Sequence, residues 1–349
     1  MLEVTERIRS LYEQGLPFFK KSVFQDLVRQ LDNCRANDPP VEGQIISIPA
    51  VDGSVVEVEL ETGLVMHHID KETELVVMDP YLDYRTFQHL TIHDDPLYFS
   101  PHLAYCPTRL IYPLRSRRSS TKEILDPWKP QALEEVQDGL DAGIKMWEDS
   151  KDCRQLQSLF RAASVPSISK VVAFGCSTMA FKVDQRGTSI TQHALILTMR
   201  DIVKQMTKSP DKPGIQCFAQ DPIYTEVDKE VLRRSGITVL EDPRAFLEVD
   251  DETVVVSFAP DIPVRQIIAD IARPAVLIWN TVWDEDEATA FWHALHPSFN
   301  PGCANRLTLA STDPESSRLI DMIRDHYSEL TTLEPKERFT GATVYIRRD

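Results

Sequence analysis

A serine stands two positions after a strand-ending glycine in the segment KVVAFGCST, residues 170–178. The β-branched run from Lys170 predicts a strand that ends at Gly175, where the missing side chain would let backbone amides approach a ligand closely. A helix after the turn would add a partial positive charge at its start. Ser177 is therefore a candidate nucleophile in an anion-stabilising loop, or merely a small residue that lets the turn close.

The same turn argues against a dinucleotide cofactor. The fingerprint G-x-G-x-x-G of such sites needs glycine or a close equivalent where this chain has Ser177 and Ala180. We therefore expect no nicotinamide or flavin, and the prediction for this protein is that it uses no cofactor.

The elements that must position Ser177 follow from hydrophobic periodicity. Strands are expected near 170–175, 215–219, 237–240, 253–258 and 275–279. Helices are expected at about 189–206, from a capping box of Thr225 and Asp228 to Gly236, and around 264–271. Short, almost wholly apolar strands joined through helices predict a parallel sheet covered on both faces. Residues 167–349 are therefore predicted to form a Rossmann-like, doubly wound α/β domain.

Residues 1–166 are predicted to form an N-terminal α+β extension. Helices are expected at about 3–14 and 21–32, and short strands at 45–48 and 55–60 around a turn at 51–53. Residues 79–130 are rich in Pro, Tyr and His, which favours a long ordered connection or lid.

A basic segment lies in this predicted connection, at residues 109–122. It gathers basic side chains around Tyr112 with no acid among them: Arg109, Arg115, Arg117, Arg118 and Lys122. One interpretation is an ordinary solvated loop. The other is a contact with a nucleic-acid backbone, with Tyr112 available for stacking.

Composition narrows the function classes. The chain has 349 residues and a net charge of -16, which disfavours generic binding to duplex DNA. No apolar run reaches the roughly 18 residues of a membrane span, and residues 1–7 lack the pattern of a secretory signal, so we expect a cytoplasmic protein. The six cysteines form no C-x-x-C pair and are expected to be reduced thiols.

Two histidine groups have ligand-like spacing, but neither is expected to bind a metal. His89 and His93 with Asp94 lack the glutamate of a metalloprotease motif, and the residues around them disfavour a helix. His67 and His68 beside Asp70 are interpreted as structural.

Five short motifs between residues 167 and 283 resemble the domain of plant "sensitivity to red light reduced" proteins. They are the turn at 174–177, Gln192 at a helix entry, Asp221-Pro222, the segment 257–263 and Trp279-Asn280-Thr281. The chain departs from the family pattern at two positions, because Ser177 replaces the usual second glycine of the turn and Asp261 replaces a frequent histidine. Both departures fall on the expected site, so the activity of the plant-type domain is not expected to carry over unchanged.

In overall layout the chain also resembles fungal arginine-containing cyclodipeptide synthases, which take two aminoacyl-tRNAs and release a cyclic dipeptide. This resemblance implies that an aminoacyl group moves from tRNA to the Ser177 hydroxyl. The amine of the second aminoacyl-tRNA then attacks that ester, and the dipeptidyl ester cyclises. The implied partners are arginyl-tRNA and a second aminoacyl-tRNA, without ATP, and the basic segment 109–122 would contact the tRNA backbone.

The acid–base residues of such a reaction are assigned by expected position. The Tyr-x-x-x-Glu signature of bacterial cyclodipeptide synthases has no counterpart that can be aligned in this chain. His193, Tyr224 and Glu226 lie on segments expected at the C-terminal edge of the sheet, where domains of this type bind ligands.

The implied arginine substrate needs carboxylate partners. Asp221 and Asp261 are expected at the same edge, although each also stands beside a proline and suits a turn. Gly175, Cys176 and Asn280 complete the predicted substrate site.

Two rival functions remain open: a non-catalytic regulatory or ligand-binding protein of the red-light family, and another Rossmann-fold transferase, such as one that uses S-adenosylmethionine. A methyltransferase usually has a more glycine-rich turn after its first strand. A serine close to acid–base partners and joined to a basic surface favours the synthase, whereas an empty, shallow apolar cleft favours the regulator.

Overall fold

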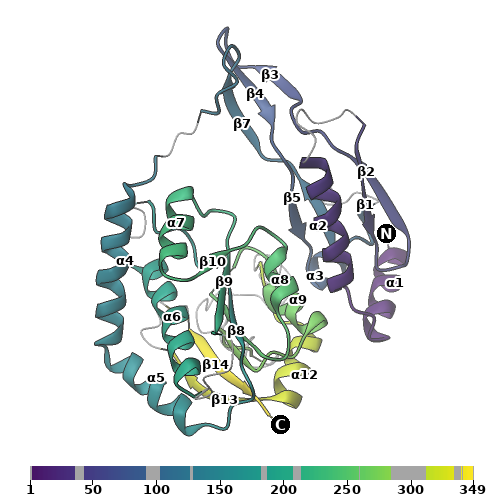
Figure 1. Cartoon of the computed structure of the whole chain (residues 1–349). Helices are drawn as coiled ribbons and strands as arrows, with labels where there is room; N and C mark the ends of the chain where they lie inside the picture. Colours follow the sequence, from purple (N-terminus) through teal and green to yellow (C-terminus); the bar gives the residue numbers. More distant parts are fainter. Residues whose placement is uncertain are drawn as a thin grey trace, which may run out of the picture. The chain divides into compact units, whose positions relative to one another are not determined.

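The computed structural model describes residues 2–35, 43–91, 103–125, 129–181, 187–206, 214–258, 260–283, 312–333, 339 and 341–348. The chain divides into two compact units, Met1–Lys129 and Pro130–Asp349 (Figure 1). In the described ranges, no helix combines the length and apolar character needed to cross a membrane.

The unit Pro130–Asp349 is built on one seven-stranded sheet. Its strands are β8 (Lys170–Phe174), β9 (Gln216–Gln220), β10 (Thr238–Val239), β11 (Thr253–Ser257), β12 (Val276–Asn280), β13 (Tyr327–Thr332) and β14 (Ala342–Arg347). They lie in the order β10-β9-β8-β11-β12-β14-β13. The first five in this order are parallel, and β14 is antiparallel to both of its neighbours. The predicted Rossmann-like, doubly wound fold is confirmed, and the antiparallel pair β13–β14 adds to it.

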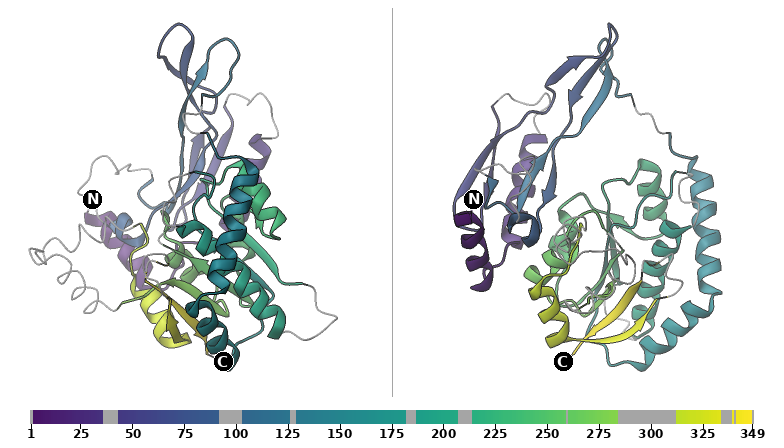
Figure 2. Two further views of the ribbon diagram at one scale, coloured as in Figure 1. Left: turned by 90° about the vertical axis from the view of Figure 1, so that its left-hand side faces the viewer. Right: turned by 180° about the vertical axis from the view of Figure 1, so that it is seen from behind.

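Helices cover both faces of this sheet. One side carries α4 (Leu133–Glu148), α5 (Lys151–Ala162), α6 (Thr188–Met206) and α7 (Glu226–Arg234). The other carries α8 (Arg244–Glu248), α9 (Val264–Ile271) and α12 (Ser317–His326), as Figures 1 and 2 show. The predicted capping box is confirmed, since the Thr225 side chain accepts from the Asp228 amide and the Asp228 side chain accepts from the Thr225 amide.

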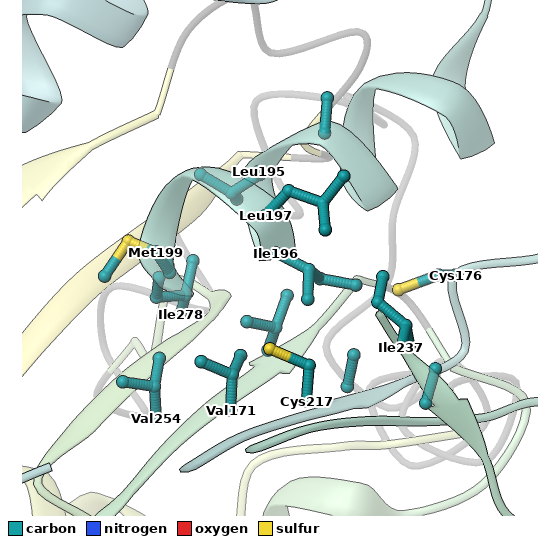
Figure 3. Packing of buried hydrophobic residues seen from close by; sticks show 14 of the residues in the cluster. Val171, Cys176, Leu195, Ile196, Leu197, Met199, Cys217, Ile237, Val254 and Ile278 are labelled. Carbon is teal, nitrogen blue, oxygen red and sulfur yellow. The ribbon is translucent and has the colours of Figure 1, made fainter. Parts of the chain in front are cut away.

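The core lies between α6 and the parallel strands. Leu195, Ile196 and Met199 of α6 are fully buried over the apolar side chains of the strands, such as Val171 and Val254 (Figure 3). Burying one such side chain stabilises the fold by about 1.5–3 kcal/mol. The helix is buried along most of its length, because both the sheet and helices α4 and α5 pack against it.

The predicted domain boundary at 166/167 lies after α5, whereas the compact unit begins at Pro130. The physical reason for this difference is packing: Trp147 of α4 is buried and donates its Nε1–H to Thr198 Oγ1 of α6 at 3.0 Å. Phe160 of α5 is buried in the same core cluster. Both helices therefore complete the layer that covers the sheet.

The unit Met1–Lys129 is an α+β unit. It contains α1 (Leu2–Glu13), α2 (Lys21–Arg35), β1 (Ile45–Pro49), β2 (Val55–Glu59), β3 (Val65–His68), β4 (Thr73–Val77), β5 (Tyr81–Tyr84), α3 (Phe87–Thr91), β6 (Thr108–Ile111) and β7 (Leu114–Arg118). Antiparallel pairing gives the sheets β1-β2, β3-β4-β7 and β5-β6. The two predicted helices and the first predicted strand pair are confirmed.

The prediction of a long connection or lid at 79–130 is wrong for the described part of that segment. It contains three paired strands and a short helix at Phe87–Thr91, where a helix was judged doubtful. The prolines stand directly before the strands, with Pro80 before β5, Pro107 before β6 and Pro113 before β7. Proline removes a ladder donor only at its own position, so here it separates strands rather than preventing them.

Candidate active site

The topology of the sheet brings two loops together at its carboxyl edge. β8 is central, the chain continues outward through β9 and β10, and it then returns to β11 on the other side of β8. Phe174 at the end of β8 is in register with Gln220 of β9 and Ser257 of β11. The loops after β8 and β11 therefore flank the switch point, which is where open α/β sheets bind ligands.

Gly175 packs closely against the loop after β11. It has a positive φ of 66°, and a Cβ on it would lie only 3.0 Å from Cβ and 3.1 Å from Cα of Pro260. The glycine thus makes room for the loop after β11.

Ser177 occupies a strained and exposed position. Its φ of 61° lies in the left-handed region, which costs a non-glycine residue about 1–2 kcal/mol. Its amide donates to Asp221 Oδ2 at 2.8 Å, and its carbonyl oxygen accepts from Ser189 Oγ at 2.9 Å. Non-glycine residues held in this way concentrate at functional sites. The predicted helix after the turn begins only at Thr188, although its first turn reaches Ser177 through Ser189.

The backbone amides of the turn are mostly occupied. Gly175 N donates to the Gln220 carbonyl at 3.2 Å, and Met179 N and Ala180 N donate to side chains of the same region. In the described ranges the amide of Thr178 has no acceptor. In hydrolases that carry a serine on a strand-to-helix turn, the amide after the nucleophile helps to bind the oxyanion, and Thr178 has that position here.

Two carboxylates lie near the turn. Asp221 is half-buried, and its oxygens accept from Ser177 N at 2.8 Å and from Ile223 N at 3.0 Å. Burial raises the pKa of Asp221, the two amide donors lower it, and the nearby Asp261 carboxylate raises it further. Asp261 is exposed in the loop after β11. The two predicted arginine-binding residues are therefore near each other, one half-buried and one accessible.

His193 and Tyr224 form a buried pair. The His193 ring is fully buried, with Nδ1 2.7 Å from the Ser189 carbonyl and Nε2 2.7 Å from the Tyr224 hydroxyl. A carbonyl oxygen only accepts, so Nδ1 carries a proton, and the Tyr224 hydroxyl can donate to Nε2 when that nitrogen is unprotonated. Burial raises the pKa of Tyr224 well above its usual value, and nearby Cys176 and Asp221 raise it further. Tyr224 therefore stays protonated at neutral pH.

The remaining predicted site residues differ in their contribution. Cys176 is fully buried and burial raises the pKa of its thiol, so it packs as an inert thiol. The Glu226 side chain is 87% exposed and pairs with Lys229 at 2.7 Å, within the first turn of α7. Asn280 ends β12, which β11 separates from β8, and its carbonyl accepts from Arg265 Nη1 at 3.4 Å. These contacts bring neither Glu226 nor Asn280 to Ser177.

Sequence reasoning missed a further contact of Asp228. It was predicted only as a helix cap, but its carboxylate also accepts from the Thr178 hydroxyl at 2.6 Å and the Met179 amide at 2.8 Å. The capping box accounts for this aspartate so completely in the sequence that nothing there indicates its contact with the Ser177 turn.

The predicted basic segment lies on β6, β7 and the turn after β7, where acids neutralise most of it. The pairs are Arg109–Asp83 at 2.5 Å, Arg117–Glu74 at 2.6 Å, Lys122–Glu74 at 2.9 Å and Arg118–Glu123 at 3.3 Å. Glu74 is buried, and its hydrogen bonds to Lys122 and Arg117 lower its pKa. Asp83 lies on β5, which pairs with β6, and Glu74 lies on β4, which pairs with β7. The sequence of segment 109–122 alone therefore does not reveal these acids.

The described residues contain no group of three or more His, Cys, Asp and Glu side chains that could hold a metal ion. His89 Nδ1 lies 3.0 Å from Thr86 Oγ1. Its predicted neighbours His93 and Asp94 lie outside the described ranges.

Comparisons with known proteins give a family but no activity. A search of curated proteins found no match. Among solved structures, the CurJ carbon methyltransferase is similar at 10% identity and a TM-score of 0.30, over 60% of this chain and 58% of that protein. The family model of the SRR1 domain, named for sensitivity to red light reduced, matches residues 150–346, which include the seven-stranded sheet up to the last residue of β14. The chain therefore belongs to the SRR1 domain family.

Proposed function

We propose that this protein is a tRNA-dependent aminoacyltransferase of the cyclodipeptide synthase type, which joins arginine to a second amino acid through an ester on Ser177. The observation that carries the proposal is the exposed, left-handed Ser177 at the switch point of the sheet. A strained serine on a tight turn after a buried strand is the arrangement by which α/β enzymes present a nucleophile.

In the proposed reaction, Ser177 Oγ attacks the carbonyl carbon of the first aminoacyl-tRNA. The bond from that carbon to the ribose oxygen of tRNA breaks, and the hydroxyl proton ends on the ribose oxygen. The Thr178 amide, which has no acceptor among the described residues, is the donor available to the oxyanion of the tetrahedral intermediate. The amine of the second aminoacyl-tRNA then displaces Ser177 Oγ, which regains a proton, and the dipeptidyl ester cyclises with release of tRNA.

We assign proton transfer at this site to the pair of Tyr224 and His193. Tyr224 holds its proton at neutral pH, and its hydroxyl is bonded to an imidazole nitrogen that can accept it. A donor and acceptor joined in this way can exchange a proton with a reacting group without admitting bulk water. Glu226 has no role in this scheme, because its exposed side chain pairs with Lys229.

Two carboxylates favour a cationic substrate. The nearby Asp261 carboxylate raises the pKa of Asp221, and a guanidinium near both carboxylates would relieve that repulsion. The half-buried Asp221 is fixed by two amides, so it can present a carboxylate oxygen without losing side-chain entropy on binding. An arginyl group fits this charge, and its planar guanidinium can bind a carboxylate through two hydrogen bonds.

The test is transfer of labelled arginine from arginyl-tRNA. Purified protein is mixed with arginyl-tRNA and a pool of other aminoacyl-tRNAs, quenched in acid, and analysed by mass spectrometry for cyclic dipeptides and for an arginyl ester on the peptide containing Ser177. We expect both in the parent protein. Ser177→Gly removes the hydroxyl and also the backbone strain, so it should be folded, at least as stable, and inactive. A folded Ser177→Gly that still releases cyclic dipeptide, or a parent protein that releases none, would refute the proposal in favour of a binding or regulatory protein.

A further inference from the structure

The turn that carries Ser177 is held by a neighbouring segment of the chain, the connection from β9 into α7. Ser177 N donates to Asp221 Oδ2 at 2.8 Å. Thr178 Oγ1 donates to Asp228 Oδ2 at 2.6 Å, and Met179 N donates to Asp228 Oδ1 at 2.8 Å. Three consecutive residues of the turn are thus bound by two carboxylates from one segment.

Asp228 makes more contacts than a helix cap needs. In a capping box, the side chain at this position of the helix accepts from the backbone amide of the N-cap residue. Asp228 does so with Thr225 N at 2.9 Å, and it also accepts from Thr225 Oγ1 at 2.8 Å. Its two remaining bonds go to Thr178 and Met179 in the loop after β8. Asp228 is fully buried, so each of these bonds lies out of competition with water.

The left-handed conformation of Ser177 needs this support. A non-glycine residue persists in that region only when its surroundings fix it. The carbonyl of Ser177 is held by Ser189 Oγ, its amide by Asp221, and the following two residues by Asp228. Without the Asp228 bonds, the chain after Ser177 could rotate toward an ordinary backbone conformation, and the hydroxyl would change direction.

We propose that Asp228 is a positioning residue, which holds Thr178 and Met179 so that the Ser177 hydroxyl and the Thr178 amide keep the geometry needed for acyl transfer. This inference rests on the proposed role of Ser177 as acyl acceptor. Asp228 touches no reacting atom; it acts through the turn. A displacement of about 1 Å at a reacting group can cost about 100-fold in rate, which sets the size of the expected effect.

The chain offers a matched pair of variants at Thr178. Thr178→Val keeps the shape of the side chain and removes the hydroxyl that donates to Asp228 and accepts from the Ala180 amide, whereas Thr178→Ser keeps the hydroxyl and both bonds. Thr225→Ala weakens the cap of α7 but leaves both bonds from Asp228 to the turn. Together with Asp228→Asn, these variants separate the cap from the turn.

Two measurements are made on the full-length variants: single-turnover formation of the arginyl ester from arginyl-tRNA, and amide hydrogen exchange of the peptide that contains residues 177–179. We expect Asp228→Asn and Thr178→Val to exchange faster at these amides and to form the ester about 10- to 100-fold more slowly at saturating arginyl-tRNA, with a nearly unchanged half-saturating concentration. Thr225→Ala should stay within about threefold of the parent rate, because both bonds from Asp228 to the turn remain. Thr178→Ser should recover the amide protection and most of the rate that Thr178→Val loses.

The inference is overturned if folded Asp228→Asn and Thr178→Val keep parental exchange at these amides, or if Thr225→Ala slows ester formation as much as Asp228→Asn does. The exchange measurement needs no activity, so it judges the restraint of the turn even if Ser177 proves not to be an acyl acceptor. Failure of the proposed function would instead appear as cyclic dipeptide made by Ser177→Gly.

Discussion

Helix α4 contacts α6 through two glycines on one face, and one substitution at each tests this packing. A Cβ on Gly139 would lie 3.8 Å from Ile190 Cδ1, an ordinary contact, whereas a Cβ on Gly143 would lie closer than 3.0 Å to Ile190 Cγ2. Alanine in place of glycine in a helix interior is worth about 1 kcal/mol in propensity. Gly139→Ala should therefore raise the free energy of unfolding by up to about that amount.

Gly143→Ala gains the same propensity but must displace Ile190. Overpacking of a core usually costs about 1–3 kcal/mol, so the net change should lie between about zero and a loss of 2 kcal/mol. Ile190→Ala removes the Cγ2 atom that the new methyl would meet. In that background Gly143→Ala should become stabilising, which gives a coupling energy of about 1–3 kcal/mol in the double-mutant cycle.

Urea unfolding, followed by circular dichroism, measures these changes in the free energy of unfolding. Hydrogen exchange of α4 and α6 assigns the transition to the unit Pro130–Asp349. Ile190 follows Ser189, whose hydroxyl binds the Ser177 carbonyl, so displacement of Ile190 should also reduce ester formation. The packing argument fails if Gly143→Ala is as stabilising as Gly139→Ala in the parent chain, or if the Ile190→Ala background leaves its effect unchanged.

Two further predictions concern the substrates. Asp221→Asn and Asp261→Asn should each lower the preference for arginyl-tRNA over a neutral aminoacyl-tRNA, and a parental preference in both variants would place the acidic pocket elsewhere. Because burial raises the pKa of Asp221, use of arginyl-tRNA should fall as the pH is lowered through that pKa. Replacing Arg115 and Arg118 with Ala should weaken tRNA binding and flatten its salt dependence. If tRNA binding by the variant depends on salt as steeply as in the parent, the segment is a solvated surface. Arg117 is left intact because it neutralises the buried Glu74.

The parallel part of the fold could be predicted because each of its strands is a short apolar run between turn residues. Val171 to Phe174, and likewise Val254 to Val256, are buried on both faces, so the strands carry little of the alternation that would suggest an exposed sheet. The capping box of α7 could be predicted for a similar reason, since its two residues are only three positions apart. Both are local patterns with one dominant physical cause.

Features that depend on pairing between distant segments could not be predicted. The role of Gly175 follows from Pro260, which arrives from the loop after β11. The strands β5, β6 and β7 were missed because their flanking prolines favour a loop in a linear reading. No local pattern places β14 between β12 and β13, because that order depends on the pairing of β14 with β12, which lies far from it in sequence.

The basic segment shows most directly why a linear window is insufficient for charge. In a sheet, the nearest neighbours of a side chain lie across the strands at about 4.5–5.5 Å, closer than the next residue on the same face of its own strand. Arg117 therefore lies opposite Glu74 of β4, although no acid is near it in sequence. The turn of Ser177 follows the same rule, since the carboxylates that hold it come from the loop after β9 and the first turn of α7. A candidate nucleophile on a strand-ending turn should accordingly be judged by the loops that follow the neighbouring strands, because those loops decide whether its backbone is held in a reactive geometry.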